Sequence, residues 1–298
     1  MGNSYRTAST GFITPIDPFT LFLIFLGFIG VFATQFQKIE AATIYFNFTL
    51  GAFALVAMAL IFQSVKRPKF EKVFTSDIDM GIFYFYIGAL IVVIFNLISS
   101  LKSYMIVRPF ALFSLDPTTV GHTFSVVKIQ TDAFWQMFYS VIAAGSLEEV
   151  LFSYFAIIIG ILLIAPFVKK FFGIGDVLGS IFGQTGADFV IAAAFSIATF
   201  TLAHVLNQTY TLSEAFIFAA LFRTAMLILL YNMNWGISAA IGFHYFNNAF
   251  AIGLDKTFAG LTTGFGWFFL GLLIVTIFMF VKNFPTTFKK AWGVKIGL

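Results

Sequence analysis

A small set of polar residues lies inside otherwise apolar stretches of this sequence. The set comprises adjacent Glu148 and Glu149, His204, Arg223, and the pair His244 and Asn248. Insertion scales put the cost of an Asp, Lys or Arg at the centre of a membrane helix at about 2.5–3.5 kcal/mol. Ionisable residues that are kept at such a cost indicate a functional site.

The spacing of these residues suggests how they act together. Glu148 and Glu149 lie about 100° apart around one helix and cannot both ionise cheaply in a low dielectric, which favours one of them as a base near neutral pH. His244 and Asn248 are four residues apart and share a helical face. His204 follows Phe200 by four residues, so the aromatic ring can fix the position of the imidazole.

A carboxylate base, imidazoles and a carboxamide are the groups that amide hydrolysis needs, namely a base to activate water and donors to hold the oxyanion. The chain has no cysteine, which favours a water nucleophile over a covalent one. We expect the groups to line one intramembrane polar cavity, open toward the face away from the termini. Two other interpretations stay open: each histidine as an interhelical hydrogen-bond donor, and the glutamate pair as a proton relay or ion site.

The elements that must position these residues are membrane helices. Hydrophobic residues make up 60% of the chain and charged residues 10%, and the mean hydropathy is +0.96, which excludes a water-soluble fold. We predict an all-α polytopic membrane protein with about eight transmembrane helices in a single membrane domain, residues 1–298. Apolar runs long enough to cross about 30 Å of hydrocarbon fall at 19–36, 41–65, 80–105, 140–166, 187–206, 213–233, 235–254 and 259–281.

Three segments do not fit simple spans. The stretch 132–166 is too long for one perpendicular span, so we expect it to tilt or to begin with an interfacial helix. The segments 106–131 and 171–186 are predicted to be long connections, either of which could form a re-entrant loop or a lid.

The basic residues predict the orientation. With eight spans, the face that holds both termini collects eleven Lys and Arg residues and the other face five, so both termini are predicted to be cytoplasmic. The net charge of +4 belongs to these loops and predicts no nucleic-acid partner.

The pattern Glu-Glu at 148–149, Phe-x-x-x-His at 200–204 and His-x-x-x-Asn at 244–248 resembles the CPBP family of intramembrane proteases, which includes the CAAX prenyl proteases and bacteriocin-processing proteins. The flanking sequences EEVLF, FSIATFTLAH and WGISAAIGFHYFNN are similar as well. The resemblance covers about residues 140–250.

This resemblance implies a role for each site residue. Glu148 would activate the water with His204 as its partner, His244 and Asn248 would form the oxyanion hole, and Glu149 would support the site. The chain departs from the family motif EExxxR at one position, where Ser153 replaces the arginine. We hypothesise that Arg223 supplies the missing charge from a neighbouring helix.

The sequence therefore predicts a metal-free and cofactor-free intramembrane endopeptidase that acts on membrane-associated peptides or proteins, such as prenylated C-termini or leader peptides. Three alternatives remain: a zinc enzyme that uses Glu148, His204 and His244, a non-catalytic scaffold of the same fold, and a small transporter.

Overall fold

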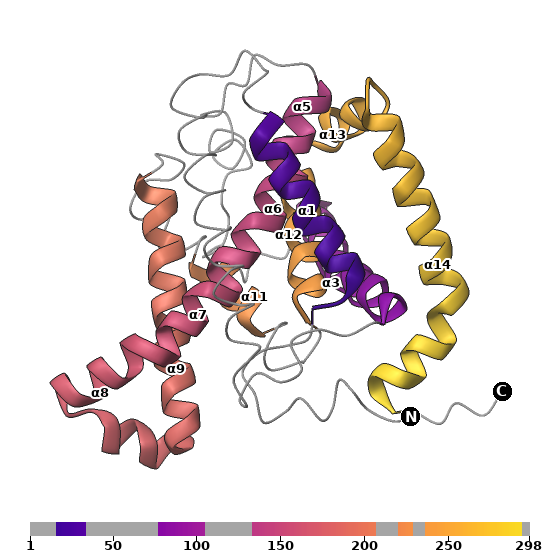
Figure 1. Cartoon of the computed structure of the whole chain (residues 1–298). Helices are drawn as coiled ribbons and strands as arrows, with labels where there is room; N and C mark the ends of the chain where they lie inside the picture. The colour runs from indigo at the N-terminus through magenta and orange to yellow at the C-terminus, as the bar shows by residue number, and fades with distance from the viewer. Residues whose placement is uncertain (1–15, 34–76, 105–132, 207–219, 229–235, 294–298) are drawn as a thin grey trace. The chain divides into compact units, whose positions relative to one another are not determined.

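A computed structural model describes residues 16–33, 77–104, 133–206, 220–228 and 236–293, and these residues are almost entirely helical (Figure 1). The all-α prediction is confirmed for this part of the chain. Helices are the expected outcome for apolar runs, because a helix satisfies its own backbone polar groups where no water is present.

Within the described residues, four helices are long and apolar enough to cross a membrane. They are Ile78–Leu97, Ala133–Phe172, Gly186–His204 and Gly266–Trp292. Two further predicted spans coincide with shorter helices, α1 (Pro18–Ala33, 16 residues) and α12 (Gly236–Ile252, 17 residues). The predicted span 41–65 and the connection 106–131 lie outside the described residues, and of 213–233 only α11 (Ala220–Leu227) and residue 228 are described. The total of eight spans therefore stays a prediction.

One helix runs without interruption over 40 residues, Ala133–Phe172. It alternates between α-helical and π-helical segments: α5 (Ala133–Met137), η5 (Phe138–Ala143), α6 (Ala144–Glu148), η6 (Glu149–Phe155), α7 (Ala156–Ile159), η7 (Gly160–Ile164) and α8 (Ala165–Phe172). Even with the smaller rise of its π-helical segments, it is longer than the hydrocarbon thickness of about 30 Å. The tilt or interfacial start predicted for this stretch stays a prediction.

Residues 171–186, predicted to connect two spans, are helical over most of their length and do not form an extended loop. The helix α8 ends at Phe172, and Gly173 turns the chain with φ 65°, a left-handed conformation that suits glycine. The next helix, α9 (Gly175–Leu206), begins at once and is kinked at Gly183 (φ 73°, ψ 161°). The segment thus forms a tight helical hairpin, because the glycines supply one turn and one kink instead of a loop.

Contacts among the described residues divide the chain into two compact units, which we describe separately. The first contains residues 147–206 and 220–237 where they are described, so it holds η6, α7, η7, α8, α9 and α11. Here α9 packs along the helix from η6 to α8 and also against α11. Gly160 allows the closest approach, since a Cβ on it would lie 2.6 Å from the Cα of Ala192.

The second unit contains α1, α3 (Ile78–Tyr104), α5 with η5, most of α12, α13 (Leu254–Leu261) and α14 (Gly266–Trp292). Here α1 packs on η5 and α3, α14 packs on α3, and α13 packs on α5. The Ala133–Phe172 helix contributes residues to both units, and the single membrane domain predicted for residues 1–298 stays a prediction.

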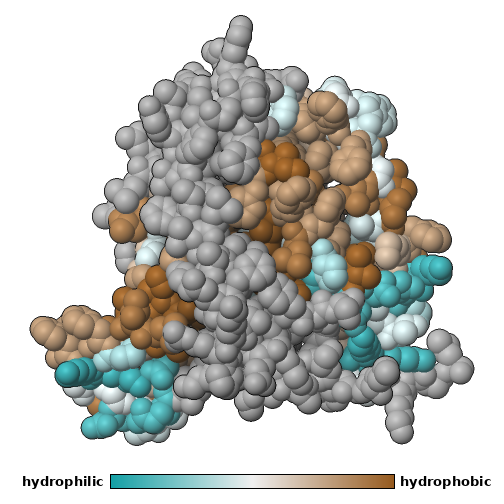
Figure 2. All heavy atoms as spheres, viewed as in Figure 1, coloured by the Kyte–Doolittle hydropathy of each residue, from teal (hydrophilic) through white to brown (hydrophobic). Residues whose placement is uncertain are grey.

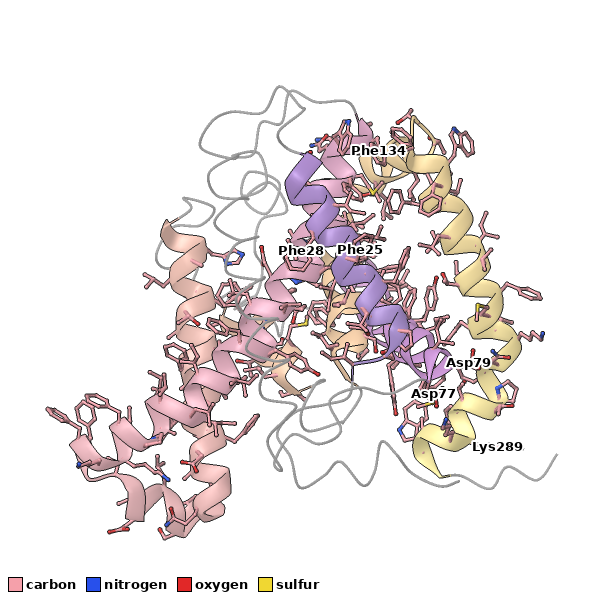
Figure 3. The ribbon with its side chains drawn as sticks, viewed as in Figure 1. Phe25, Phe28, Asp77, Asp79, Phe134 and Lys289 are labelled. Carbon is pink, nitrogen blue, oxygen red and sulfur yellow. The ribbon has the colours of Figure 1, made fainter. Side chains whose placement is uncertain are left out.

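Polar contacts tie one end of α3 to the end of α14 in the second unit (Figure 3). Asn283 donates to Asp79 at 3.0 Å, and Lys290 pairs with Asp77. At the start of α1, the Asp17 carboxylate accepts hydrogen bonds from the Thr20 backbone N–H at 2.9 Å and the Thr20 hydroxyl at 2.7 Å, so Asp17 is the N-cap of that helix.

Candidate functional site

The two glutamates lie where the long helix changes from α-helical to π-helical geometry. Glu148 is the last residue of α6 and Glu149 the first of η6. Both side chains are buried, with relative exposures of 8% and 0%. Single π-helical turns inside α-helices are frequent at functional sites, which makes this segment a candidate for one.

Arg223 is the partner of Glu149. Its side chain extends from α11 into the interior of the first unit and is completely buried. Its Nη1 donates to both carboxylate oxygens of Glu149, at 3.1 and 3.2 Å. Its Nη2 donates to the hydroxyl of Ser153, which donates in turn to Glu149 Oε2 at 2.5 Å. The pairing that we hypothesised from the sequence is therefore present, and Ser153 helps to build it.

Further groups surround the Arg223 guanidinium. Its Nε donates to Ser196 Oγ at 3.3 Å, and its Cζ lies 5.7 Å from the ring centroid of Phe152 and 5.2 Å from that of Phe200. A buried charge is costly unless it is paired and fully hydrogen-bonded, and an aromatic face adds a favourable cation–π term. Because arginine stays protonated in proteins, Glu149 is held as the carboxylate of this ion pair.

Ser196 connects the two helices that carry the candidate catalytic residues. Its hydroxyl donates to the backbone carbonyl of Phe152 at 2.7 Å, inside η6, and accepts from Arg223. It lies on α9, two steps of four residues before His204, so Ser196, Phe200 and His204 share one helical face. We did not predict Ser196, although its place as a small polar residue on the His204 face was a usable signal.

His204 lies near the end of α9 and is held in a defined orientation. Its Nδ1 lies 2.9 Å from the carbonyl oxygen of Phe200, and its ring packs on the Phe200 ring with centroids 4.2 Å apart. A carbonyl oxygen can only accept, so Nδ1 carries a hydrogen. The other ring nitrogen, Nε2, lies 3.9 Å from Glu148 Oε2.

The separation between Glu148 and His204 is chemically informative. At 3.9 Å it exceeds a direct hydrogen bond, and polar groups at such a distance are commonly joined through a water molecule. Neither side chain is completely buried, since 10% of the Glu148 side chain and 19% of the His204 side chain are exposed. A carboxylate and an imidazole nitrogen facing one another in this way can share a proton with a water between them.

The other two predicted site residues belong to the second unit. His244 and Asn248 lie on α12 and are buried, with relative exposures of 3% and 6%. Asn248 Nδ2 donates to the backbone carbonyl of Ser140, within η5, at 2.8 Å. The structure therefore groups Glu148, Glu149 and His204 in one unit, and that His244 and Asn248 complete their site stays a prediction.

Asn248 also has a structural role, because its side chain bonds to the backbone of another helix. The amide nitrogen has two hydrogens, and one is committed to the Ser140 carbonyl. Beside it, the hydroxyls of Tyr245 and Ser146 are hydrogen-bonded, and a Cβ on Gly145 would lie 2.6 Å from the Tyr245 ring. Neither the Tyr245–Ser146 pair nor the Ser140 contact was predicted, because both depend on which helices meet.

Within the described residues, no three His, Asp or Glu side chains form a group that could hold a metal ion. Comparisons with protein-family models, with curated proteins and with solved structures gave no match for this chain. The interpretation of the site therefore depends on its own geometry and on the motifs in the sequence.

Proposed function

We propose that this protein is an intramembrane endopeptidase that hydrolyses peptide bonds of membrane-associated substrates with glutamate-activated water. The observation that carries the proposal is the facing pair of Glu148 and His204. Glu148 Oε2 lies 3.9 Å from His204 Nε2, and His204 is the last residue of the apolar span Gly186–His204. The three ordered motifs, Glu-Glu, Phe-x-x-x-His and His-x-x-x-Asn, support the same conclusion through their resemblance to CPBP proteases.

The environment of the glutamates assigns them different roles in this proposal. Glu149 accepts hydrogen bonds from Arg223 and Ser153, so its carboxylate is neutralised and unsuited to removing a proton from water. Glu148 faces the His204 imidazole, whose Nε2 lies 3.9 Å from its Oε2. Glu148 is therefore the general base, and Glu149 is a positioning residue that fixes the helix through Arg223.

The reaction follows from these roles. Water between Glu148 and His204 gives a proton to the Glu148 carboxylate while its oxygen attacks the scissile carbonyl carbon. His204 Nε2 orients this water, with its ring fixed by the Nδ1 hydrogen bond to the Phe200 carbonyl. By the resemblance to CPBP proteases, His244 and Asn248 would supply the donors that stabilise the tetrahedral oxyanion. Collapse breaks the C–N bond, and the proton held by Glu148 passes to the leaving amine.

Two alternatives predict different behaviour. A zinc enzyme using Glu148, His204 and His244 would lose activity when the metal is chelated. A non-catalytic scaffold, or a transporter in which Glu148 and His204 relay protons, would cleave nothing. The pairing of Arg223 with Glu149 weakens the main sequence-based reason for the scaffold, which was the replacement of the motif arginine by Ser153.

The test is cleavage of a panel of membrane-tethered peptides, including prenylated C-termini and leader peptides, by the purified chain in lipid bilayers. Removing a general base typically costs a factor of about 10²–10⁴ in rate, so Glu148→Gln should lose at least that much. His204→Gln should fall similarly. The unfolding temperature of each variant, measured in the same bilayers, separates lost catalysis from lost fold.

The outcomes separate the candidates. Activity that resists a chelator and is lost in Glu148→Gln supports the proposal. Activity that the chelator abolishes moves the assignment to a zinc enzyme. If the folded chain cleaves no member of the panel, that result contradicts the proposed protease activity.

A further inference from the structure

The hairpin formed by α8 and the first turns of α9, residues 165–182, exposes many large apolar side chains. The most exposed are Phe167 (58%), Phe171 (73%), Phe172 (64%), Val177 (60%), Ile181 (64%) and Phe182 (52%). Exposed apolar side chains are ordinary on a membrane-spanning helix. What requires explanation is their depth, because this hairpin is a turn between two spans.

The depth of the hairpin is marked by an ion pair. The apolar span Gly186–His204 has 19 residues and therefore extends about 28 Å, close to the hydrocarbon thickness of about 30 Å. Lys169 Nζ on α8 pairs with Asp188 Oδ1 on α9 at 2.6 Å, near the start of that span. Charged groups belong at the membrane interface, so this pair marks the hydrocarbon edge. Residues 170–185 then lie beyond the edge.

The two short helices of the hairpin each separate apolar from polar residues. On α8, Phe167 and Phe171 are four residues apart and stack with ring centroids 5.3 Å apart, while Lys169 and Lys170 point elsewhere around the helix. At the start of α9, Val177 and Ile181 share one face, and Asp176 and Ser180 share another. In the space-filling view, the hairpin at the lower left has hydrophobic atoms on one side and hydrophilic atoms on the other (Figure 2).

We propose that this hairpin is an interfacial membrane-binding element at the edge of the bilayer. Its phenylalanine, valine and isoleucine side chains enter the boundary between headgroups and acyl chains, and the exposed Lys170 contacts lipid phosphates. An amphipathic segment with aromatic residues on one face and lysines on the other is what such a surface binds. The lysines also place the hairpin on the side that the positive-inside rule assigns to the cytoplasm. This proposal is independent of the proposed protease activity.

The absence of cysteine from the chain makes the test direct. Single-cysteine variants Phe171→Cys and Ile181→Cys carry a spin label in the full chain, reconstituted in phosphatidylcholine bilayers. Collision with oxygen and with a water-soluble nickel chelate then reports depth. Both labels should lie about 5–10 Å below the phosphates, since that is how deep interfacial helices bury their apolar face. Ser180→Cys, on the polar face of the same hairpin, is the matched control and should meet the nickel chelate.

Two results would overturn the proposal. If the Phe171 and Ile181 labels meet the nickel chelate as freely as the Ser180 label, the hairpin projects into water. If they meet neither reagent, another protein surface covers them.

A second arm tests the headgroup contact. In bilayers that contain phosphatidylglycerol, Lys170→Gln should make the Phe171 label shallower, while in pure phosphatidylcholine it should change the depth far less. An equal shift in both lipids would refute the role of Lys170 with anionic headgroups.

Discussion

At the scale of single residues, the feature with the clearest energetic meaning is the buried charge at Arg223. Taking a guanidinium and a carboxylate out of water costs several kcal/mol per ion, and their attraction offsets this only when the remaining donors and acceptors are also satisfied. Glu149, Ser153 and Ser196 supply those partners, and Phe152 and Phe200 supply aromatic faces. The network joins α9, α11 and η6 around the buried guanidinium of Arg223.

Breaking this pair on one side should be strongly destabilising. Arg223→Ala leaves the Glu149 carboxylate buried without its cation, and such a change costs about 3–5 kcal/mol of unfolding free energy. The double variant Arg223→Met with Glu149→Gln should cost clearly less than the sum of its single changes. Titration with denaturing detergent in mixed micelles measures all of these values, and additive costs would contradict the coupling.

Ser153 offers a rescue of the same network. Arg223→Ala vacates volume beside the Ser153 hydroxyl, so Ser153→Arg in that background should place a guanidinium one turn from Glu149 and recover part of the lost stability. The control is Ser153→Arg in the wild-type chain, where Arg223 already fills the space and the change should destabilise. Failure to recover any stability would mean that the two positions are not interchangeable.

Asp17 should give the stability a pH dependence. Burial raises the pKa of the Asp17 carboxyl above its usual range, against the opposing hydrogen bonds from Thr20. The folded chain then binds this proton more tightly than the unfolded chain, so its contribution to stability is full below the unfolded pKa near 3.8 and is lost as the pH rises through the folded pKa.

The variant Asp17→Asn isolates this effect, because asparagine keeps an acceptor for the Thr20 N–H but cannot ionise. Relative to the wild type, Asp17→Asn should gain thermal stability as the pH rises above the unfolded pKa near 3.8. Melting curves in detergent across that range provide the measurement, and parallel curves for the two proteins would contradict the assignment.

The residues with chemistry could be predicted from the sequence because an ionisable side chain in an apolar run is conspicuous. Arg223 was such a residue, and its pairing with Glu149 followed from the missing motif arginine. The place of Ser196 on the His204 face is visible in the sequence, but the partners of Ser196 and the Asn248–Ser140 contact are not, since they depend on which helices meet.

At the scale of helices, close approach through glycine determines how α3 and α12 pack. A Cβ on Gly242 would lie 2.0 Å from the carbonyl oxygen of Phe85, and one on Gly88 would lie 2.1 Å from that of Ala239. Small residues let membrane helices pack backbone against backbone, where van der Waals contacts replace the missing hydrophobic force.

Gly242→Ala should therefore destabilise the chain by about 1–3 kcal/mol, the usual cost of overpacking a core. Gly271→Ala is the matched control, because a Cβ there meets nothing within 4 Å and alanine favours the helix. The same detergent titration compares the two, and an equal response of both variants would show that the glycine contact is unimportant.

The apolar runs of the sequence predicted several of the described helices. The runs at 80–105 and 187–206 agree to within a few residues with α3 (Ile78–Tyr104) and with the span Gly186–His204. The last span was placed too early, at 259–281 instead of Gly266–Trp292, because α13 is apolar enough to extend the run. The hairpin at Gly173 was missed, since glycines indicate a break without giving its length.

At the scale of the whole molecule, the distribution of basic residues predicts topology. Thr263 precedes α14 and Lys289 lies in its last turns, so the two positions are at opposite ends of a helix long enough to cross the membrane. With both termini in the cytoplasm, Thr263→Cys should react with a membrane-impermeant maleimide in intact cells, and Lys289→Cys only after permeabilisation. The reverse pattern would invert the predicted orientation.

The π-helical segments also change what an insertion or deletion would do to this protein. A π-helical segment contains more residues per turn than an α-helix, so it changes the direction in which the side chains after it point. Deleting one residue within Glu149–Phe155 would let that stretch relax to α-helical geometry without breaking the helix. The shortened α-helical stretch would turn the chain through nearly the same angle, so Gly160 would still face Ala192. A deletion in α7, outside the π-helical segments, would instead rotate Gly160 away from Ala192.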